Sequence, residues 1–313
     1  MQPPLHALMK PSPLPSLEQG LQMSIISAAI NTDTQPDGEA IDRFLAEDIG
    51  TGDLTASILS ELATATATVV TRETMVLCGQ CWFDAVFLRL DPQIDIHWHQ
   101  QEGSVAEAGS TLCTVQGSAR SVMTGERTAL NLLQTLSATA TMARQYAKAV
   151  EGTGVHILDT RKTLPGLRHA QKYAVRCGGC QNHRMGLSDG ILIKENHILA
   201  AGSISQAVRA AQSLRRDVMI EVEVENLQEL EEALAAGAQR IMLDEFSLPQ
   251  IREAVRITDK RAKLEVSGNV SLETISEIAE TCVDYISVGA LTKHVRAIDL
   301  SMRVTLDASD NAE

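Results

Sequence analysis

The stretch from Lys172 to Arg184, which reads KYAVRCGGCQNHR, carries side chains that could perform two different kinds of chemistry. Cys177, Cys180 and His183 are spaced three residues apart, as in part of a metal site or a redox motif. The same stretch holds arginine, histidine and a glycine pair, which together can bind an anion. Zinc would need a fourth ligand, and none stands at a suitable spacing. We therefore predict that Cys177 packs in the core and that His183 and Arg184 form the chemical pair.

The basic side chains of this acidic protein are concentrated around that stretch. The formal net charge of −13 argues against general nucleic-acid binding but not against a local anion site. For Arg168 and Lys172, which are four residues apart, a salt-bridged surface helix is the better interpretation. The basic residues between Asp159 and His197 outnumber the acidic ones and are Arg161, Lys162, Arg168, Lys172, Arg176, Arg184 and Lys194.

The termini and the cysteines indicate a cytoplasmic protein. The first residues are proline-rich and lack the apolar core of a signal peptide. No apolar run approaches the ~18 residues of a transmembrane helix, so no membrane partner is expected. Without a secretion signal we expect free thiols, and we expect Cys78 and Cys81 to lie in a buried, strand-like run. We predict a flexible extension over residues 1–35 and an acidic tail at the other end.

Residues 36–150 mix helical and strand-like patterns. The segment 39–59 opens with a short helix and then turns at Gly50 and Gly52. The segments 63–79 and 94–122 alternate small polar with apolar residues, which is typical of strands. Lipoyl and biotinyl carrier domains show similar spacing, but the exposed lysine at a hairpin tip that they require is missing from this sequence. The segment 124–150 predicts one long helix with apolar residues at helical spacing.

From residue 151 to 295 the pattern becomes a regular alternation of strands and amphipathic helices. Such alternation predicts a parallel sheet, which becomes a barrel if it closes. The six strand candidates are fewer than the eight of a regular α/β barrel, so we predict an incomplete parallel α/β barrel. They lie at residues 155–162, 189–196, 218–225, 240–246, 263–269 and 284–290.

Polar residues stand at the C-terminal ends of these strands, where a purely structural strand would carry Val or Ile. Because the C-terminal ends of parallel barrel strands form the active-site face, these residues should converge on one cavity. The last two strands end in SGN and GAL, small residues that we expect to lead into helices and bind phosphate. The strand-end residues are Asp159, Arg161, Lys162, Lys194, Glu223, Asp244, Ser267 and Gly289.

Three classes of function are compatible with such a site. Basic residues beside Glu223 and Asp244 favour an enzyme acting on a phosphate-bearing substrate and a carboxylate-bearing partner. Lys194 or Lys162 could instead form a Schiff base, but that requires a lysine isolated in an apolar pocket, and here each has charged neighbours in the sequence. A phosphate-binding module without catalysis ranks third, since binding alone would not need two carboxylates at separate strand ends.

Several longer segments resemble the quinolinate phosphoribosyltransferase family, whose members are also called carboxylating nicotinate-nucleotide pyrophosphorylases. The segment DTRKTLPGLRHAQKYAVRCGG, followed by NHRMGLSDGILIKENHI, closely resembles the family signature. In chain order, EDIGTGDLT, TGERTALNLLQ, IEVEVENL, IMLDEF, VSGNV and SVGALTKHV also match, so that the resemblance covers about residues 36–305. The family fold is an α/β sandwich domain followed by an incomplete α/β barrel. We therefore expect a sandwich domain over 36–150, the barrel over 151–295, and a C-terminal segment, 296–313, that packs back on the sandwich.

The resemblance implies an activity and a set of residue roles. Members transfer the 5-phosphoribosyl group of phosphoribosyl pyrophosphate to quinolinate with loss of CO2, in the synthesis of NAD; they require Mg²⁺ and no organic cofactor. Lys162, Lys194, Glu223 and Asp244 would be catalytic, and Glu223 and Asp244 would meet magnesium indirectly, through pyrophosphate and water. The quinolinate residues would be Arg127, Arg161, Lys162, His183 and Arg184. The phosphoribosyl pyrophosphate residues would be Lys194, Glu223, Asp244, Ser267, Gly268, Gly289 and Lys293.

The resemblance also implies that Arg127 reaches the site from a partner subunit, so that a homodimer is the smallest active unit; higher oligomers stay open. Two positions depart from the family pattern: Cys180 replaces a usual glycine, and Glu245 replaces a common asparagine. A paralogue encoded with molybdenum-transport genes shares the barrel and is the alternative within this resemblance.

Overall fold

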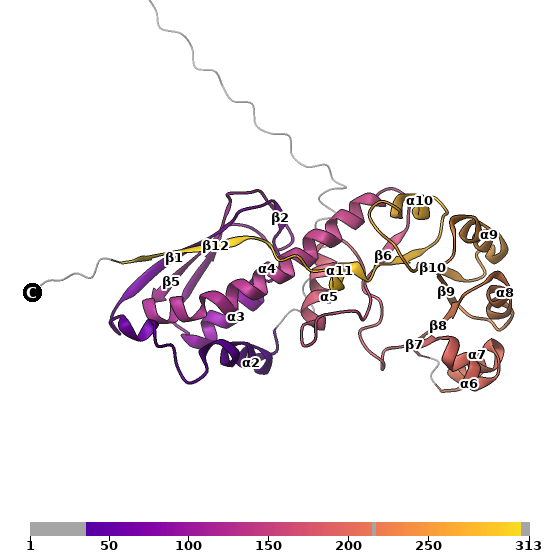
Figure 1. Ribbon diagram of the computed structural model, residues 1–313, viewed down its shortest axis with the longest axis horizontal. Helices are drawn as coiled ribbons and strands as arrows, with labels where there is room; N and C mark the ends of the chain where they lie inside the picture. Colours follow the sequence, from indigo (N-terminus) through magenta and orange to yellow (C-terminus); the bar gives the residue numbers. More distant parts are fainter. Residues whose placement is uncertain (1–35, 215–216, 308–313) are drawn as a thin grey trace, which may run out of the picture. The chain divides into compact units, whose positions relative to one another are not determined.

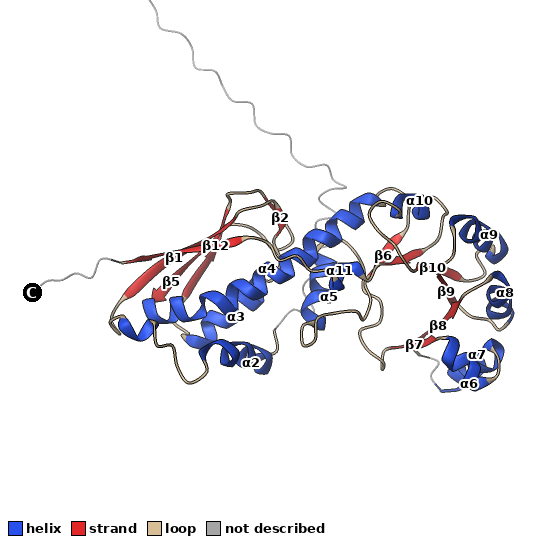
Figure 2. Cartoon of the chain, in the orientation of Figure 1, coloured by secondary structure: helices blue, strands red, loops and turns tan. Residues whose placement is uncertain are grey.

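The computed structural model describes residues 36–214 and 217–307, which form an antiparallel sheet region followed by a parallel α/β region (Figures 1 and 2). The predicted N-terminal extension and the end of the acidic tail lie outside the described residues. The antiparallel region contains helix α2 (Gly38–Ile49), the 3-10 helix η1 (Ala56–Ile58), strands β1 (Thr64–Thr71) and β2 (Met75–Val76), helix α3 (Gln80–Leu90), strands β3 (Asp95–Trp98), β4 (Val105–Ala106) and β5 (Thr111–Ser118), and helix α4 (Ala119–Ala149).

The sheet of this region has the strand order β12-β1-β5-β3, and its first strand comes from the opposite end of the chain. Strand β12 (Leu300–Leu306) runs antiparallel to β1, with Ala65 opposite Leu306 and Thr71 opposite Leu300. The alternation expected for a half-buried strand is visible in β1, where Ala65, Ala67 and Val69 are fully buried. The residues from the predicted C-terminal segment thus complete the N-terminal sheet.

The expected strand-like run around Cys78 and Cys81 is only partly a strand. Strand β2 ends at Val76, and Cys81 lies in α3. Trp82, Phe83, Val86 and Phe87 of that helix are buried, which is helical rather than strand spacing. The prediction was wrong here because a short apolar run does not distinguish a strand from a buried helix.

Helix α4 confirms the predicted long helix and begins five residues before the segment in which it was expected. It packs against α3 and against α5 (Arg168–Cys177). The approach to α5 is close, because a Cβ atom on Gly178 would lie 2.4 Å from Ala143 Cβ. A side chain at position 178 would therefore push the end of α5, and the loop that follows it, away from α4.

The parallel region confirms the fold class predicted from the sequence, an incomplete parallel α/β barrel preceded by an α/β sandwich (Figure 2). Its remaining elements are strand β6 (His156–Leu158), strand β7 (Gly190–Ile193), helices α6 (Glu195–Ala201) and α7 (Ile204–Leu214), strand β8 (Met219–Val224), helix α8 (Leu227–Ala235), strand β9 (Arg240–Asp244), helix α9 (Leu248–Thr258), strand β10 (Lys263–Ser267), helix α10 (Ile275–Ala279), strand β11 (Tyr285–Ser287) and helix α11 (Ala290–Lys293).

The barrel is open between β6 and β7. The strand order is β6-β11-β10-β9-β8-β7, so β6 pairs with the last strand of the series and not with the next one. The chain that leaves α5 runs alongside β6 instead: Gln181 N–H donates to Ile157 O at 2.8 Å, and Asp159 N–H donates to Gln181 O at 3.1 Å. Residues 181–184, which contain the predicted chemical pair, are thereby fixed beside the barrel opening.

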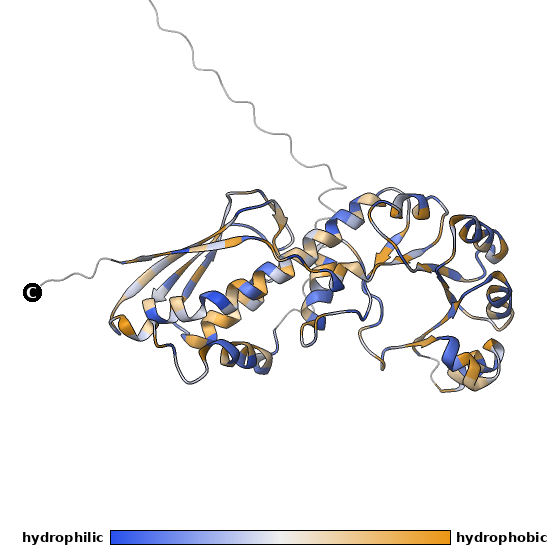
Figure 3. Ribbon diagram, in the orientation of Figure 1, coloured by the Kyte–Doolittle hydropathy of each residue, from blue (hydrophilic) through white to orange (hydrophobic). Residues whose placement is uncertain are grey.

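The two faces of the barrel strands differ in polarity. Val222, Val224, Ile241 and Leu243 point outward and belong to the apolar core that the strands share with the outer helices. Figure 3 shows hydrophobic and hydrophilic residues along α8 and α9, as expected for helices with one buried face. The inward positions carry many charged residues, although regular barrels fill this space mainly with branched apolar side chains. The interior of this barrel is therefore arranged for polar chemistry.

Candidate active site

A cavity of about 730 Å³ opens at the C-terminal ends of the barrel strands. Its wall includes Glu223 of β8, Asp244 at the end of β9 and Ser267 at the end of β10. In parallel barrels this end of the strands carries the active site, because loops of many lengths can be placed there without disturbing the sheet. All sequence-predicted site residues except Arg127 and Asp159 line the cavity, namely Arg161, Lys162, His183, Arg184, Lys194, Glu223, Asp244, Ser267, Gly268, Gly289 and Lys293.

Arg127 is placed elsewhere, on the exposed surface of α4. Its side chain is 60% exposed and lies 3.8 Å from Glu126. The side chain therefore contributes nothing to the cavity of its own subunit.

Four basic residues at the mouth of the cavity form what we call the cationic rim: Arg161, Lys162, Arg184 and Lys293. Within the described part of the chain, none of them forms an ion pair. Burial, reinforced by the charge of Arg161, lowers the pKa of Arg184. Guanidinium and ammonium groups that lack acidic partners provide a strong local attraction for an anion, despite the acidic balance of the whole protein.

Lys162 owes its position to Gly289. A Cβ atom at position 289 would lie 3.1 Å from Lys162 Cδ, which is tighter than ordinary van der Waals contact. The backbone N–H of Lys162 donates to Thr160 Oγ1 at 3.1 Å. The small residue at the end of β11 therefore leaves room for a lysine side chain as well as for a ligand.

Lys194 and Glu223 form an ion pair at the wall of the cavity. Lys194 is the N-cap residue of α6, and its backbone N–H donates to His197 Nδ1 at 3.0 Å. The Lys194 side chain is 45% exposed, so solvent weakens this pair, and a ligand could displace the lysine toward an anion.

The end of β9 explains why asparagine is a natural residue beside Asp244. Glu245 has a φ of 55°, in the left-handed region that asparagine tolerates better than most residues. Its backbone N–H donates to Ser267 O, and a Cβ on Gly268 would lie 2.8 Å from Glu245 Cγ. Gly268 itself has a φ of 99°, so a side chain there would clash and strain the backbone. The substituted Glu245 keeps this geometry and makes a long contact with Asn269 Nδ2, at 3.4 Å.

The predicted helix after SGN begins later than expected. Helix α10 starts at Ile275 rather than directly after Asn269, and α11, which does follow Gly289, is a single four-residue turn. The argument from helix N-termini is therefore wrong for the first loop and weak for the second. Gly268 and Gly289 still line the cavity, where their backbones are accessible to a ligand.

Lys172 and Asp159 correct two predictions. Lys172 is not on a salt-bridged surface: it is fully buried and forms an ion pair with the equally buried Asp159. Asp159 does not line the cavity either, because its carboxylate accepts the His183 backbone N–H at 2.9 Å and Asn182 Nδ2 at 2.6 Å. Burial raises the pKa of Asp159 and lowers that of Lys172, while their mutual attraction opposes both shifts. The pair holds the loop that carries the site.

A second group of charges lies deeper in the barrel, with Glu265 in the wall of the cavity, and was not predicted. We call it the buried charged layer; it consists of Glu221, Arg240 and Glu265, and His183 contacts it. His183 Nε2 lies 2.7 Å from Glu221 Oε2, and Arg240 forms ion pairs with both glutamates, at 3.1 Å from Glu221 Oε1. Arg240 also lies over the ring of Tyr285, 4.1 Å from its centroid. Burial next to Glu221 raises the pKa of Glu265 to about 7.

A signal for this layer was present in the sequence. In IEVEVEN, Glu221 and Glu223 are two residues apart, and successive strand residues point to opposite faces, so both glutamates must share the inward face. Glu265 and Ser267 have the same relation in the strand KLEVS. The prediction from strand ends included Glu223 and Ser267. It missed Glu221 and Glu265, which lie two residues earlier in the same strands.

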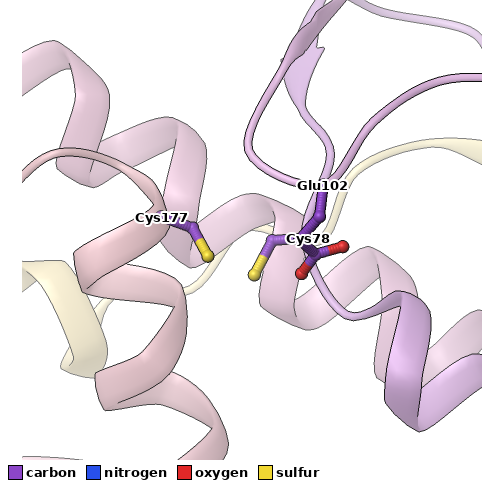
Figure 4. Close-up of side chains that lie close together, drawn as sticks. All are labelled: Cys78, Glu102 and Cys177. Carbon is purple, nitrogen blue, oxygen red and sulfur yellow. The ribbon is translucent and has the colours of Figure 1, made fainter. Parts of the chain in front are cut away.

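The cysteines and histidine of the opening stretch do not form one metal site. Cys180 Sγ points at Ala143 O, at 3.2 Å, whereas Cys177 lies beside Cys78 and Glu102 (Figure 4). Burial raises the pKa of Cys180 to about 12, so its thiol is neutral. Cys180 therefore fills space against α4.

Two groups of side chains are spaced closely enough to hold a metal ion: Cys78, Glu102 and Cys177, and His183, Glu221 and Glu265. In the first, the two carboxylate oxygens of Glu102 accept the backbone N–H groups of Gly79 and Gln80, at 2.8 and 3.2 Å. Burial raises the pKa of Cys78 well above its usual range, which opposes thiolate formation. In the second group, His183 Nε2 lies 2.7 Å from Glu221 Oε2, while Glu265 Oε1 is buried without a hydrogen-bond partner among the described residues.

Comparisons with known proteins agree with this architecture. Two family models match the chain: Quinolinate phosphoribosyl transferase, N-terminal domain, over residues 53–137, and Quinolinate phosphoribosyl transferase, C-terminal domain, over residues 139–303. A probable nicotinate-nucleotide pyrophosphorylase (carboxylating) of Bacillus subtilis is 41% identical over 267 residues, covering 85% of this chain and 92% of the relative. A nicotinate-nucleotide pyrophosphorylase (carboxylating) of Mycobacterium leprae is 42% identical over 274 residues, covering 84% and 95%. The solved nicotinate-nucleotide pyrophosphorylase of Francisella tularensis is 47% identical, with a TM-score of 0.83 over 88% of this chain and 100% of that one.

Proposed function

This chain belongs to the quinolinate phosphoribosyltransferase family, and from that premise we infer its reaction and propose how its residues perform it. The enzyme transfers the 5-phosphoribosyl group from phosphoribosyl pyrophosphate to quinolinate with decarboxylation. The products are nicotinate mononucleotide, pyrophosphate and CO2, and the reaction belongs to the de novo synthesis of NAD. The observation that carries this conclusion is the cationic rim, which lies beside two carboxylates at the end of the barrel in a chain that matches the family over most of its length.

We propose that quinolinate, a dicarboxylate, is held at the cationic rim. Arg161 and Arg184 offer planar guanidinium groups that can bind a carboxylate through two hydrogen bonds, and Lys162 adds a charge beside them. Because these groups have no ion-pair partners among the described residues, binding a dianion relieves their mutual repulsion. This arrangement favours an acceptor with two negative charges over a neutral pyridine.

We propose that phosphoribosyl pyrophosphate occupies the rest of the cavity. Lys194, Glu223 and Asp244 would surround the ribose and the pyrophosphate, while Ser267, Gly268, Gly289 and Lys293 would bind phosphate. The glycines allow the backbone to approach the ligand closely. Lys194 would leave Glu223 for the pyrophosphate, which is consistent with its half-exposed ion pair.

The donor set also fits the magnesium that the family requires. Carboxylate oxygens are the protein ligands that Mg²⁺ prefers, and it commonly keeps several waters while bridging to substrate phosphates. We propose that Glu223 and Asp244 hold it indirectly, through pyrophosphate and water. When bound, the ion would neutralise the charge of the pyrophosphate as it leaves.

In the first chemical step, the bond between ribose C1 and the pyrophosphate oxygen breaks as the quinolinate nitrogen forms a new bond to C1. Glu223 and Asp244 stabilise the positive charge that develops on the ribose, and Lys194 stabilises the departing pyrophosphate. In the second step, the adjacent carboxylate leaves as CO2, and its bonding electrons stay on the ring carbon, which then takes up a proton. The positive ring nitrogen stabilises that carbanion, so the protein contributes mainly orientation and exclusion of water.

We further propose a homodimer in which Arg127 completes the quinolinate site of the partner subunit. The Arg127 side chain is exposed on α4. Beside that helix, η1 and the loops before and after it expose Leu54, Ile58 and Leu62, which are 83–91% exposed. These apolar side chains would be covered in a subunit interface. We also propose a cytoplasmic location; no helix in the described residues is long and apolar enough to span a membrane.

A mixing experiment tests the shared site. Arg127→Ala and Lys162→Ala variants are each expected to be nearly inactive, and hybrid dimers formed from both should recover part of the activity, because one of their two sites is intact. If hybrids form, as shown by two different affinity tags on one dimer, and stay inactive, the two residues do not serve one shared site.

The activity itself is tested with Mg²⁺, phosphoribosyl pyrophosphate and quinolinate, by measuring nicotinate mononucleotide and CO2. Absence of both products would contradict the assignment, and turnover of another acceptor with quinolinate inert would favour the molybdenum-associated paralogue. Borohydride trapping addresses the Schiff-base alternative: irreversible labelling at Lys194 or Lys162 would support an aldolase-like mechanism, and we expect none.

A further inference from the structure

All four hydrogen-bonding atoms of His183 are already engaged inside the protein. Its backbone N–H donates to Asp159 Oδ1 at 2.9 Å, and its backbone carbonyl accepts from Lys172 Nζ at 3.1 Å. Its ring Nδ1 accepts the backbone N–H of Arg184 at 2.8 Å, and its ring Nε2 lies 2.7 Å from Glu221 Oε2. A residue with this set of contacts has no ring nitrogen left for a substrate carboxylate.

The contacts determine the protonation state of the ring. Because Nδ1 accepts a hydrogen bond, it carries no proton, and the proton of a neutral imidazole must be on Nε2, where it is donated to Glu221. A charged imidazolium would place an N–H on Nδ1 directly against the N–H of Arg184. The direction of the pKa shift agrees with this geometry, since burial and the neighbouring cations lower the pKa of His183.

The partners of His183 are themselves held in place. Glu221 is fully buried and paired with Arg240, which also pairs with Glu265 and lies over an aromatic ring. On the backbone side, Asn182 connects Asp159 to the end of α5: its amide nitrogen donates to the carboxylate and its oxygen accepts from Arg176 at 2.8 Å. The ring and the backbone of His183 are thus anchored to two separate buried networks.

What His183 positions is Arg184, the next residue. The Arg184 backbone is fixed by its N–H bond to His183 Nδ1, and its guanidinium donates to Gly190 O at 3.0 Å. Gly190 packs against this side chain, since a Cβ there would be in van der Waals contact with Arg184 Cβ, at 3.4 Å. Contacts at its backbone and at its guanidinium therefore fix the direction in which the Arg184 side chain approaches the cavity.

We infer that His183 is a positioning residue rather than a ligand of the substrate, and that Glu221, acting through it, orients Arg184 for the quinolinate carboxylate. This inference rests on the proposed function for the identity of the ligand, but the state of the ring in the free protein does not depend on it. It replaces the expectation from the family resemblance that His183 binds a carboxylate directly. Within this subunit the substrate carboxylates are then held by Arg161, Lys162 and Arg184 of the cationic rim.

The first test measures the protonation state of the His183 ring by NMR, in the full-length protein labelled with ¹⁵N at histidine. The two-bond couplings between ring nitrogens and carbon-bound protons distinguish the two neutral tautomers and the imidazolium, and His183→Asn assigns the signals. We expect a neutral ring with its proton on Nε2 at pH 8, unchanged when quinolinate saturates the protein. A proton on Nδ1, a charged ring, or a change of state on quinolinate binding would overturn the inference.

The second test distinguishes a substrate-binding His183 from a positioning His183 by the direction in which Glu221→Leu changes the KM for quinolinate. If His183 bound quinolinate through Nε2, Glu221 would compete for that proton, and Glu221→Leu would leave the KM for quinolinate unchanged or lower it. If Glu221 positions the ring, Glu221→Leu should raise the KM for quinolinate by about ten- to a hundredfold, the scale of a misplaced binding group, with the KM for phosphoribosyl pyrophosphate unchanged. Glu221→Gln, which keeps an acceptor oxygen, should recover most of this loss.

Glu253→Leu, an exposed change on α9, is the matched control and should leave both KM values unaltered. Should Glu221→Leu fail to fold, the ring measurement on the unaltered chain still decides the question. Failure of quinolinate to bind at all would count against the proposed function, whereas a wrong tautomer in the free protein would count against the positioning role.

Discussion

The cationic rim and the buried charged layer are neighbours in the same barrel, yet their charges are arranged in opposite ways. The four cations of the rim have no ion-pair partners among the described residues and face the cavity. The charges of the layer beneath face one another, with Arg240 between Glu221 and Glu265. Unpaired charge at the surface attracts a ligand, while paired charge in the interior fixes geometry.

His183 and the Asp159–Lys172 pair connect the two regions. The loop that carries Arg184 of the rim is held by the ring and backbone contacts of His183, which lead to Glu221 and to Asp159. The comparison thus predicts a division of effects: changes in the rim should weaken substrate binding and leave the fold intact, and changes below it should first affect stability and the direction of the rim side chains.

The largest effect on stability is expected from breaking the Asp159–Lys172 pair. Lys172→Met removes one member of a fully buried pair and leaves an uncompensated carboxylate, which should lower the free energy of unfolding by about 3–5 kcal/mol. Chemical denaturation measures this, with Lys260→Met, an exposed lysine, as the control. A loss below about 1 kcal/mol would show that the pair does not hold the loop.

Arg184→Ala should have the largest effect on binding. Removing this guanidinium should weaken quinolinate binding by roughly 2–5 kcal/mol, the range for removing one partner of a desolvated charge pair. Calorimetric titration gives the affinity, and the melting temperature should stay close to that of the unaltered protein. Arg252→Ala, on the exposed side of α9, should change neither quantity. Unaltered quinolinate affinity would show that Arg184 does not bind quinolinate.

Glu265→Gln should produce a smaller, pH-dependent effect on stability. Glu221, Arg240 and His183 surround Glu265, and its pKa is raised from 4.5 to about 7, so the folded protein binds this proton more tightly than the unfolded chain does. The stabilisation is complete below pH 4.5 and is lost as the pH rises to about 7. Glutamine stays neutral throughout.

The free energy of unfolding of Glu265→Gln, relative to the unaltered protein, should therefore rise between pH 5 and pH 7 and level off above it. Denaturation curves at a series of pH values measure the difference. A constant difference across this range would mean that Glu265 titrates normally and that the layer does not retain its proton.

Cys180→Gly should have the smallest effect, because Cys180 belongs to neither region. It restores the usual family residue, removes a buried thiol that contacts Ala143 O, and adds backbone freedom, which should cost about 1 kcal/mol of stability. Steady-state kinetics should be unchanged. A marked loss of activity would show that the packing of Cys180 against α4 affects the positions of the rim side chains.

Sequence reasoning found the rim far more readily than the layer beneath it. Strand-end residues such as Lys194 and Asp244 follow from topology, because parallel strands deliver their C-terminal ends to one face. The open barrel was also predictable, from six strands instead of eight. Glu221 and Glu265 were overlooked because a charge inside an apolar strand resembles the polar half of an alternating pattern.

Lys172 shows a second reason for failure. Its spacing from Arg168 is typical of an exposed helical face, and nothing within α5 distinguishes that face from a buried one. The partner that makes burial possible, Asp159, follows β6 and contacts Lys172 across the fold. Pairings between distant elements, like the late start of α10, are decided by tertiary contacts that a local pattern does not contain.

A crystal structure of the protein with quinolinate would test the central claim most directly, because it locates the substrate relative to both regions at once. We predict that the quinolinate carboxylates lie on Arg161 and Arg184 at the cationic rim, with His183 Nε2 still bonded to Glu221. Quinolinate bound away from the rim, or a carboxylate bonded to a ring nitrogen of His183 with Glu221 released, would contradict the account.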